Sequence, residues 1–577
     1  MRWILAALLL ASLLIGLSHV AGLPPFEGID ETAHYSYIEQ IAKTGILPRF
    51  GDKLRQDVRD VEDALAAGQR RDLRDVEDAL AAGRIIWTLR YRDLFTADAE
   101  IIKRARQAVK ALRDPPPTGK PESARNWQAQ HPPFYYVLLT PAYLLSERWS
   151  LARQFVLLRG LSYLAAWLSL CLVVFVAAKT FPASGPGRAM IAAPALWPFV
   201  FPGWFPEMAR LGNDSLVTLL VGCAMAVVTC APIRRWSTWL LLGAICGLGA
   251  LTKATFLPFL AAIALLLLYR TWRRDASPWQ FLGFLATVIA VAGWWYIERL
   301  VETGMLFATV ENIGLKENGG LIVNLLQHFS VGTLAWAIPA AGLSFLWGGT
   351  RSFVTPPLSV LAPLVVMLLL IGGAYSFGFH GYRKYPLVQI TRLILGFWAL
   401  AIIYPTLVFM ALYGRMKMGL FGYGGFPGYY LHSLAPALAP VLGIAITTVA
   451  RNWLARTVLW LLMGYNIVFL FGATFMQFLY FAGCGSIGNN RFNVASASAC
   501  WNDWQHLTDN LNVLAYPLAA LWLAVGGAIA LGAGALVSLV LVSSRTSNSK
   551  LVAAYPFGEG RLREIGSGAW PRGRRAV

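Results

Sequence analysis

Residues 3–20 read WILAALLLASLLIGLSHV, and residues 24–35, which follow after a three-residue gap, read PPFEGIDETAHY. The first stretch is an apolar run close to the ~20 residues that a helix needs to cross the hydrocarbon core of a bilayer. The second stretch places acidic side chains and a histidine where such a helix would leave the bilayer. Ionisable groups at this depth of a membrane protein are functional candidates. The two stretches together predict a membrane helix that leads directly into a functional segment.

The composition extends this prediction to the whole chain. Its 577 residues are 57% hydrophobic and only 14% charged, whereas a soluble domain averages roughly 25% charged residues. The sequence therefore predicts an all-α polytopic membrane protein with about twelve transmembrane helices. These spans are expected near 3–21, 154–179, 189–207, 215–232, 236–251, 254–271, 280–298, 357–377, 393–412, 430–450, 457–480 and 513–541. The first span is expected to be a retained helix and not a signal peptide, because no small-x-small cleavage pattern stands out.

The distribution of Lys and Arg predicts the topology. If the apolar stretches 132–147 and 331–348 are embedded helices that do not span, the short basic loops all share one side, as the positive-inside rule requires. Both termini are then cytoplasmic, and the exoplasmic pieces are about 22–153, 299–356, 413–429 and 481–512. Long loops of this kind are usually functional, so we expect the first loop, with its interfacial helices, to carry chemistry outside the cytoplasm.

Three other features receive structural interpretations. The net charge of +19 is attributed to the positive-inside rule and to anionic lipid headgroups, and no nucleic acid is expected as a partner. The sequence RDVEDALAAG occurs at 59–68 and again at 74–83, which we interpret as an insertion in a surface helix. Cys484 and Cys500 lie in a polar loop and predict a disulfide if that loop faces an oxidising compartment. No cysteine spacing typical of a metal site is present.

The acidic segment allows two interpretations. Asp30 is predicted to be the N-cap of a helix from Glu31 to about Lys43, with Gly45 as its stop. Helical spacing puts Glu31 and His34 on one face of that helix. Capping alone would explain the acids, but a capping carboxylate is also held rigidly, as catalysis requires.

Three more polar constellations lie at the predicted exoplasmic surface. The first two have structural alternatives, which are interfacial anchoring and helix capping respectively. In the third, a lysine on the exoplasmic side runs against the positive-inside trend and suggests a negatively charged ligand, whereas contact with lipid headgroups is its structural alternative. The three constellations are Gln130-His131-Pro132-Pro133-Phe134-Tyr135-Tyr136, Arg210-Leu211-Gly212-Asn213-Asp214-Ser215, and Leu251-Thr252-Lys253-Ala254-Thr255.

Taken in order, these motifs resemble the GT-C membrane glycosyltransferases, and most closely the bacterial branch of protein mannosyltransferases and aminoarabinose transferases. The resemblance covers about residues 1–450 as a catalytic region that includes the loop 22–153. Residues 451–542 would form C-terminal helices with the loop 481–512, and 543–577 a basic cytoplasmic tail. One departure is Gly425-Phe426-Pro427-Gly428-Tyr429-Tyr430-Leu431, where relatives often carry Gly-Arg-Tyr and this chain has no arginine.

The resemblance implies transfer of a sugar from a polyprenyl-phosphate donor to an exoplasmic acceptor, which is a lipid, a glycan or a protein. It implies a location in the bacterial inner membrane, with the active site on the periplasmic side. Asp30 would be the base and Glu31 would orient the acceptor or the base, while the two non-spanning helices would wall a groove for the lipid tail. The residues expected to bind substrate are His34, His131, Tyr135, Asn213, Asp214, Lys253, Arg210, Arg415 and Lys417.

No cofactor is implied with confidence. A divalent cation would be held only if Asp30, Glu31 and Asp214 came together, and we expect no metal. The alternative functions are a transporter or flippase of lipid-linked sugars, an O-antigen polymerase or ligase, and a purely structural subunit. The helix interiors are nearly free of charge, which disfavours a transporter.

Overall fold

The computed structural model describes residues 1–49, 52, 126–348, 358–413, 428–481, 487–488, 491–492 and 515–546. These residues form helices almost throughout, with one short antiparallel pair of strands, β1 (Ile487–Gly488) and β2 (Arg491–Phe492). The α-helices are α1 (Arg2–Gly22), α2 (Glu31–Thr44), α7 (Phe134–Ser146), α8 (Leu151–Thr180), α9 (Gly187–Val200), α10 (Trp204–Ala209), α11 (Asp214–Cys230), α12 (Trp236–Ala250), α13 (Leu257–Trp272), α14 (Pro278–Thr303), α15 (Val310–Glu317), α16 (Leu321–His328), α17 (Val331–Leu346), α18 (Leu358–Gly378), α19 (Pro386–Tyr413), α20 (Ala435–Val449), α21 (Trp453–Phe481) and α24 (Pro517–Thr546). Four 3-10 helices join them, η1 (Trp127–Gln130), η2 (Ala254–Phe256), η3 (Phe379–Tyr382) and η4 (Gly428–Leu434).

The predicted all-helical membrane architecture is confirmed. Among the described residues, 8 helices are long and apolar enough to cross a membrane. Four shorter apolar helices accompany them: Phe134–Ser146, Asp214–Cys230, Trp236–Ala250 and Pro386–Phe397. The predicted total of about twelve spans stays a prediction.

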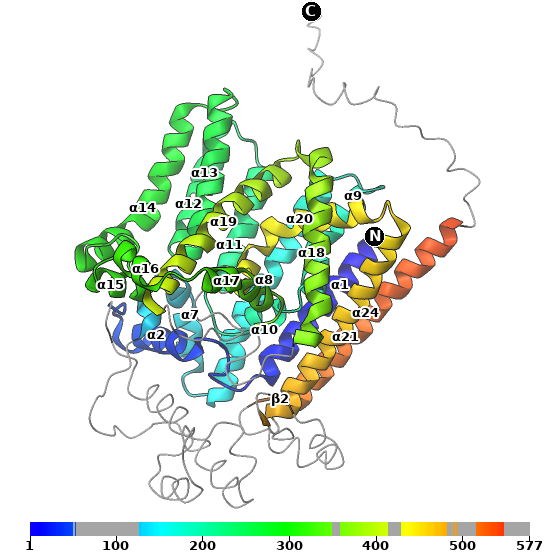
Figure 1. The fold of residues 1–577 in the computed structure, drawn as a ribbon, viewed down its shortest axis with the longest axis horizontal. Helices are drawn as coiled ribbons and strands as arrows, with labels where there is room; N and C mark the ends of the chain where they lie inside the picture. Colours follow the sequence, from blue (N-terminus) through cyan, green and yellow to red (C-terminus); the bar gives the residue numbers. More distant parts are fainter. Residues whose placement is uncertain are drawn as a thin grey trace, which may run out of the picture.

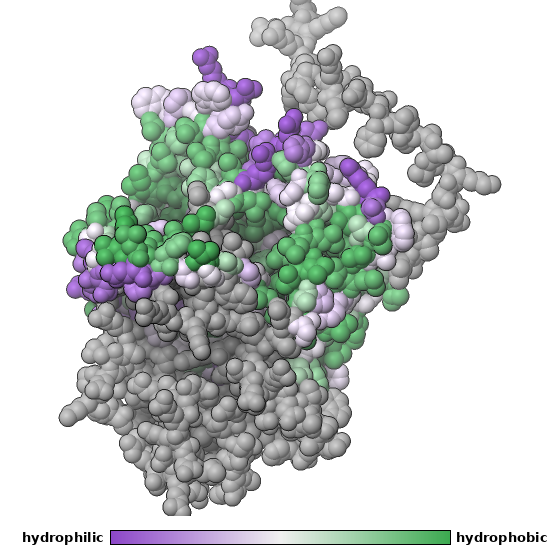
Figure 2. Space-filling view, viewed as in Figure 1, coloured by the Kyte–Doolittle hydropathy of each residue, from purple (hydrophilic) through white to green (hydrophobic). Residues whose placement is uncertain are grey.

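The helices are arranged with a polar site at one end and basic turns at the other. In Figure 1 the turns that follow α13 and α18 lie at the upper end of the molecule, whereas α2 and α7 lie toward the lower end. Figure 2 shows hydrophobic residues across the middle of this face, with hydrophilic residues at its upper end and another hydrophilic group at the left, below the hydrophobic band. The basic turns Arg270–Arg274 and Arg383–Lys384 therefore lie on the side opposite to α2, as the positive-inside argument predicts.

Both stretches that we expected to be non-spanning form short helices. Helix α7 has 13 residues and α17 has 16, which gives lengths of about 20 and 24 Å at the rise of an α-helix. A hydrocarbon core is about 30 Å thick. Neither helix is among those long enough to span.

The predicted single span 189–207 is wrong, because it consists of two helices, α9 and α10. Pro202 has no N–H to continue α9, and Gly203 approaches α17 so closely that a Cβ there would lie 2.7 Å from the Phe345 carbonyl oxygen. The Gly203 N–H donates to the Leu346 carbonyl at 3.0 Å. This break turns the chain after α9 and brings Glu207 and Arg210 under the polar site.

Helices from opposite ends of the sequence pack together. Helices α1 and α24 lie side by side (Figure 1), and the Tyr516 N–H donates to the Ala21 carbonyl at 2.9 Å. Gly527 makes close packing possible, since a Cβ there would lie 2.5 Å from Ile15. Helix α1, which leads into the acidic segment, is therefore braced by the last described helix.

Candidate functional site

Asp30 is the N-cap of α2, as predicted, but its side chain makes no capping hydrogen bond. Its backbone is left-handed, with φ of 63°, a conformation that is uncommon for a residue other than glycine but that Asp tolerates. The carboxylate accepts one hydrogen bond, from Trp127 Nε1 to Oδ1 at 3.1 Å. Oδ2 accepts none from the described residues, and the side chain keeps partial exposure. A strained backbone that presents an open carboxylate favours a functional role over capping.

Glu31 and Arg159 hold the strained turn in place through a buried ion pair. Both side chains are fully buried, and Arg159 Nε donates to Glu31 Oε1 at 2.7 Å. Arg159 also donates to the carbonyl oxygens of Leu23 and Pro24, the residues that lead into the turn. Glu31 further accepts from the Leu211 N–H at 2.7 Å and the Gly28 N–H at 2.9 Å. With both carboxylate oxygens engaged, Glu31 and Arg159 fix the position of Asp30.

Arg210 ties the same turn to α10 and α11. Its NH1 donates to the Ile29 carbonyl at 2.9 Å, directly before Asp30. Its other nitrogens bind Glu207 and the Oδ2 of Asp214, the latter at 3.1 Å. Arg210, Glu207 and Asp214 are each at least nine-tenths buried. The guanidinium is therefore a buried positive charge at the foot of the Asp30 turn.

Lys253 completes the positively charged side of the site. Its Nζ binds Asp214 Oδ2 at 2.7 Å, and both residues are buried. The side-chain amide of Asn213 donates to the Thr252 carbonyl at 3.3 Å, which joins the start of α11 to the turn that carries Lys253. Asn213 Oδ1 and Asp214 Oδ1 are buried and accept no hydrogen bond from the described residues. Two acceptors that lack donors need water or a ligand hydroxyl.

Two tyrosines of η4 close the site from above. Lys253 Nζ lies 4.0 Å from the centroid of the Tyr430 ring, and the Arg210 guanidinium lies 5.9 Å from that of Tyr429. Such contacts are attractive cation–π interactions. Asp30 is close enough to both phenols to interact with them electrostatically. The segment without the expected arginine thus supplies aromatic rings to two cations that come from elsewhere.

The two histidines are held as neutral imidazoles. His34 Nδ1 is 3.0 Å from the Tyr136 hydroxyl, and burial together with the Arg210 and Lys253 charges lowers the pKa of His34 well below its usual value. Burial and the nearby Lys253 lower the pKa of His131 to about 3. Neutral imidazoles accept and donate hydrogen bonds without adding positive charge.

The structure brings most of the predicted residues together and assigns a structural contact to one of them. Tyr135 donates to or accepts from Ser162 of α8 at 2.8 Å, inside the helical core. Arg415, Lys417, Cys484, Cys500 and the repeats at 59–68 and 74–83 lie outside the described residues. Within the described residues, no group of three or more His, Cys, Asp or Glu side chains could hold a metal ion.

Sequence reasoning did not identify five residues of this site. They come from elements that are remote from Asp30 in the chain and are Trp127, Arg159, Glu207, Tyr429 and Tyr430. Glu207 lies three residues before Arg210, a spacing typical of an ion pair. Arg159 is an arginine within a predicted span, which is a functional signal by default. Both signals were present in the sequence.

Replacing His131 with Gln is expected to reduce the acid sensitivity of the fold. The unfolded chain takes up a proton near pH 6.5 whereas folded His131 does so only near pH 3. The stability that neutral His131 supports is therefore complete above pH 6.5 and is lost as the pH falls toward 3, by at most about 1.4 kcal/mol per pH unit. Thermal unfolding between pH 7 and 4 should show a smaller decrease for His131→Gln than for the wild type. An unchanged decrease would contradict this assignment, and the exposed His380→Gln is the control.

Comparison with known proteins gives structural likenesses alone. No protein-family model and no curated protein sequence matches the chain. ArnT from Cupriavidus metallidurans bound to undecaprenyl phosphate is 15% identical, with a TM-score of 0.39 over 91% of this chain and 76% of that protein. An oligosaccharyltransferase from Archaeoglobus fulgidus is 13% identical, with a TM-score of 0.38 over 83% of this chain and 55% of that protein. Both are GT-C membrane glycosyltransferases, the superfamily that the motifs resemble. Likenesses this weak support no conclusion about activity.

Proposed function

We propose that this protein is an integral membrane glycosyltransferase that moves a sugar from a polyprenyl-phosphate donor to a hydroxyl of an exoplasmic acceptor. One observation carries the proposal: the partly exposed carboxylate of Asp30 stands on a turn bound to Arg210, and Arg210 shares Asp214 with Lys253. A base and a pair of cations within one polar site suit a reaction that removes a proton at one atom and releases a phosphate at another.

The reaction begins at the acceptor. Asp30 Oδ2, which the described residues leave open, takes the proton of the acceptor hydroxyl as its oxygen attacks the anomeric carbon of the donor. The bond between that carbon and the phosphate oxygen breaks, and its electron pair leaves with the polyprenyl phosphate. Attack from the side opposite the phosphate inverts the anomeric centre. A positioned carboxylate base contributes about 10²–10⁴-fold to such a step.

The cations stabilise the leaving phosphate. Negative charge grows on the phosphate oxygen as the bond breaks, and Lys253 and Arg210 lie where water is largely excluded. Preorganised positive groups in such a site lower the barrier more than they would in water. The unsatisfied oxygens of Asn213 and Asp214 accept hydrogen bonds from sugar hydroxyls. His34 and His131, both neutral, orient the substrates without repelling the cations.

An apolar cavity of about 280 Å³, reached by η4 through Leu431, suits the donor tail. It lies between α9, α17, α18 and α20, and Leu431, which directly follows Tyr430, contributes to its wall. Helix α17 lines it through Gly342 and Phe345, whereas α7, the other helix proposed to wall the groove, contributes none of its lining residues. Polyprenyl chains are purely apolar, so a water-poor cavity beside the phosphate position favours them as donors.

The same geometry supports a proposal for the location. The basic turns lie at the end opposite to α2, and the positive-inside rule places them in the cytoplasm. Together with the resemblance to bacterial relatives, this supports our proposal that the protein lies in the bacterial inner membrane, with Asp30 and its partners on the periplasmic side.

Replacing Lys253 with Met tests the donor site directly. Purified protein in detergent should bind polyprenyl phosphate about tenfold or more weakly, because one charge-assisted contact to a phosphate is lost. Lys253→Arg should retain most of the affinity since the charge remains. Binding is measured by titration of the protein's tryptophan fluorescence with the lipid.

The matched control is Lys179→Met, which removes an exposed lysine at the end of α8. It should bind polyprenyl phosphate as the wild type does. If a folded Lys253→Met protein binds the lipid with wild-type affinity, the phosphate does not lie at Lys253 and the proposed donor site is wrong.

A further inference from the structure

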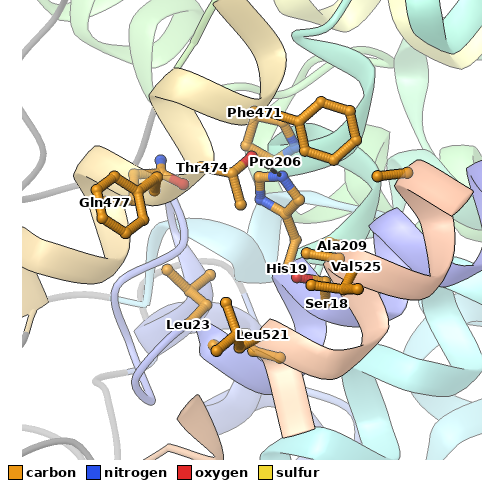
Figure 3. A pocket seen from close by; sticks show the side chains of 15 residues that line it. Ser18, His19, Leu23, Pro206, Ala209, Phe471, Thr474, Gln477, Leu521 and Val525 are labelled. Atoms are coloured by element: carbon orange, nitrogen blue, oxygen red, sulfur yellow. Dashed lines mark hydrogen bonds between the residues drawn. The ribbon is translucent and has the colours of Figure 1, made fainter. Parts of the chain in front are cut away.

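A second pocket lies between α1, α21 and α24, apart from the Asp30 site. It has a volume of about 270 Å³ and is lined by Ser18, His19, Gly22, Leu23, Pro206, Ala209, Phe471, Thr474, Phe475, Gln477, Ala520, Leu521, Ala524, Val525 and Ala528. For comparison, an apolar cavity of about 150 Å³ holds benzene. Figure 3 shows the labelled side chains of α1, α21 and α24 around the space. The pocket is large enough for a segment of an aliphatic chain.

One polar group in this apolar pocket has no partner among the residues that the structure describes. The Thr474 hydroxyl donates its proton to the Leu470 carbonyl at 2.7 Å, so it accepts a hydrogen bond from His19 Nε2 at 3.2 Å (Figure 3). The Thr474 hydroxyl and this nitrogen of His19 therefore have hydrogen-bond partners. Gln477 is 6% exposed, and its Nε2 donates to none of the described residues. A buried amide without an acceptor is costly. The missing partner is an oxygen acceptor.

The polar end of the pocket lies near the headgroups of the bilayer, and its apolar end lies deeper in the hydrocarbon core. Gln477 lies about one turn before the end of α21 (Trp453–Phe481). It is about 36 Å along the helix from Trp453 at the rise of an α-helix, farther than the ~30 Å of the hydrocarbon core, which places the amide near the headgroups. Ala520, Ala524 and Ala528 recur at one-turn spacing down α24, and their small side chains leave the space that leads inward. An occupant therefore has its acceptor oxygen at the interface and its chain in the hydrocarbon.

The mouth of the pocket opens onto the surface that faces lipid. Phe475 and Val525 line the pocket and are 37% and 40% exposed. Around them α21 and α24 expose Val468, Trp522 and Ile529, side chains that belong against a bilayer and not in water. The molecules that can enter the pocket from this surface are therefore membrane lipids.

We propose that this pocket binds one ester-linked acyl chain of a bilayer phospholipid, whose ester carbonyl accepts a hydrogen bond from Gln477. The acyl chain runs inward past Ala524 toward Ala528. Its position also supports the Asp30 turn, because Leu23 lines the pocket and the Leu23 carbonyl accepts a hydrogen bond from Arg159. The binding does not depend on glycosyl transfer.

Photolabelling in nanodiscs tests the proposal on the full-length protein. The probe is a phosphatidylethanolamine with a diazirine on one acyl chain, and its matched analogue carries the same chain through an ether, without the carbonyl. Wild-type protein should be labelled on α21 and α24. The ester probe should label about fivefold more strongly than the ether analogue, because one hydrogen bond contributes about that factor to binding. Gln477→Leu should remove this preference. Ala524→Phe, which fills the space, should reduce labelling about tenfold or more, with Ala524→Leu in between.

The controls separate the pocket from the general lipid surface. Ile529→Phe enlarges a side chain that is 67% exposed on α24 and does not line the pocket, so its labelling should equal that of the wild type. The proposal is overturned if folded Ala524→Phe or Ala524→Leu protein is labelled as strongly as the wild type, or if the wild type shows no ester preference. The same assay in an Asp30→Asn background should give wild-type labelling, so failure of the transferase proposal leaves this result intact.

Discussion

Asp30→Asn is expected to lower the rate of sugar transfer about 10²–10⁴-fold, because an amide cannot take the proton of the acceptor hydroxyl. The substitution is well matched to the site. Asn tolerates the left-handed backbone of residue 30 as Asp does, and its side-chain oxygen still accepts the hydrogen bond from Trp127. The measurement is release of polyprenyl phosphate from a sugar-loaded donor by reconstituted protein.

Two comparisons make this result specific to Asp30. Asp275→Asn, in the exposed turn after α13, should transfer sugar at the wild-type rate. Asp30→Asn should unfold at the wild-type temperature and bind polyprenyl phosphate as before, since neither the turn nor the cations change. A folded Asp30→Asn protein that retains more than about a tenth of the wild-type rate would exclude Asp30 as the base.

Arg159→Met is expected to destabilise the protein by about 3–5 kcal/mol, because it leaves the Glu31 carboxylate buried without its cation. The substitution also removes the hydrogen bonds that Arg159 donates to the carbonyl oxygens of Leu23 and Pro24. The turn that presents Asp30 is then released, so transfer activity should fall together with stability. Thermal unfolding in one detergent and the transfer assay measure the two effects.

The double variant Arg159→Met with Glu31→Gln distinguishes charge burial from loss of packing. Removing both charges should restore part of the stability that the single Arg159→Met change loses. Activity should stay low in the double variant, because the carbonyl oxygens of Leu23 and Pro24 remain without their donor. If Arg159→Met unfolds like the wild type, the buried ion pair does not hold the turn.

The local features of the site could be predicted from the sequence because they depend on neighbouring residues. Helix α2 begins at Glu31 and stops at Gly45, which is left-handed with φ of 68°, as the capping pattern indicated. The short helices α7 and α17 follow from apolar length and from the positions of basic residues. The single span 189–207 was wrong because the close approach of Gly203 to α17 is a tertiary contact that no local pattern encodes.

The assembly of the site could not be predicted in the same way. Glu31 meets Arg159 across 128 positions of sequence, and a periodic apolar run does not indicate which arginine will face which acid. In the sequence, 425–431 stands out only as a departure, because it lacks the arginine that relatives often carry there. The structure instead places Tyr429 and Tyr430 over Arg210 and Lys253, so aromatic rings position cations that other segments supply.

The packing of α1 against α24 has a consequence for the order of biosynthesis. Helix α1 leaves the ribosome about 500 residues before α24, the helix that packs against it through Gly527 against Ile15. The nascent chain must therefore hold α1 in the bilayer without its final neighbour during most of translation. The turn that carries Asp30 follows α1 directly, so the helix that leads into it gains its final neighbour only after α24 inserts.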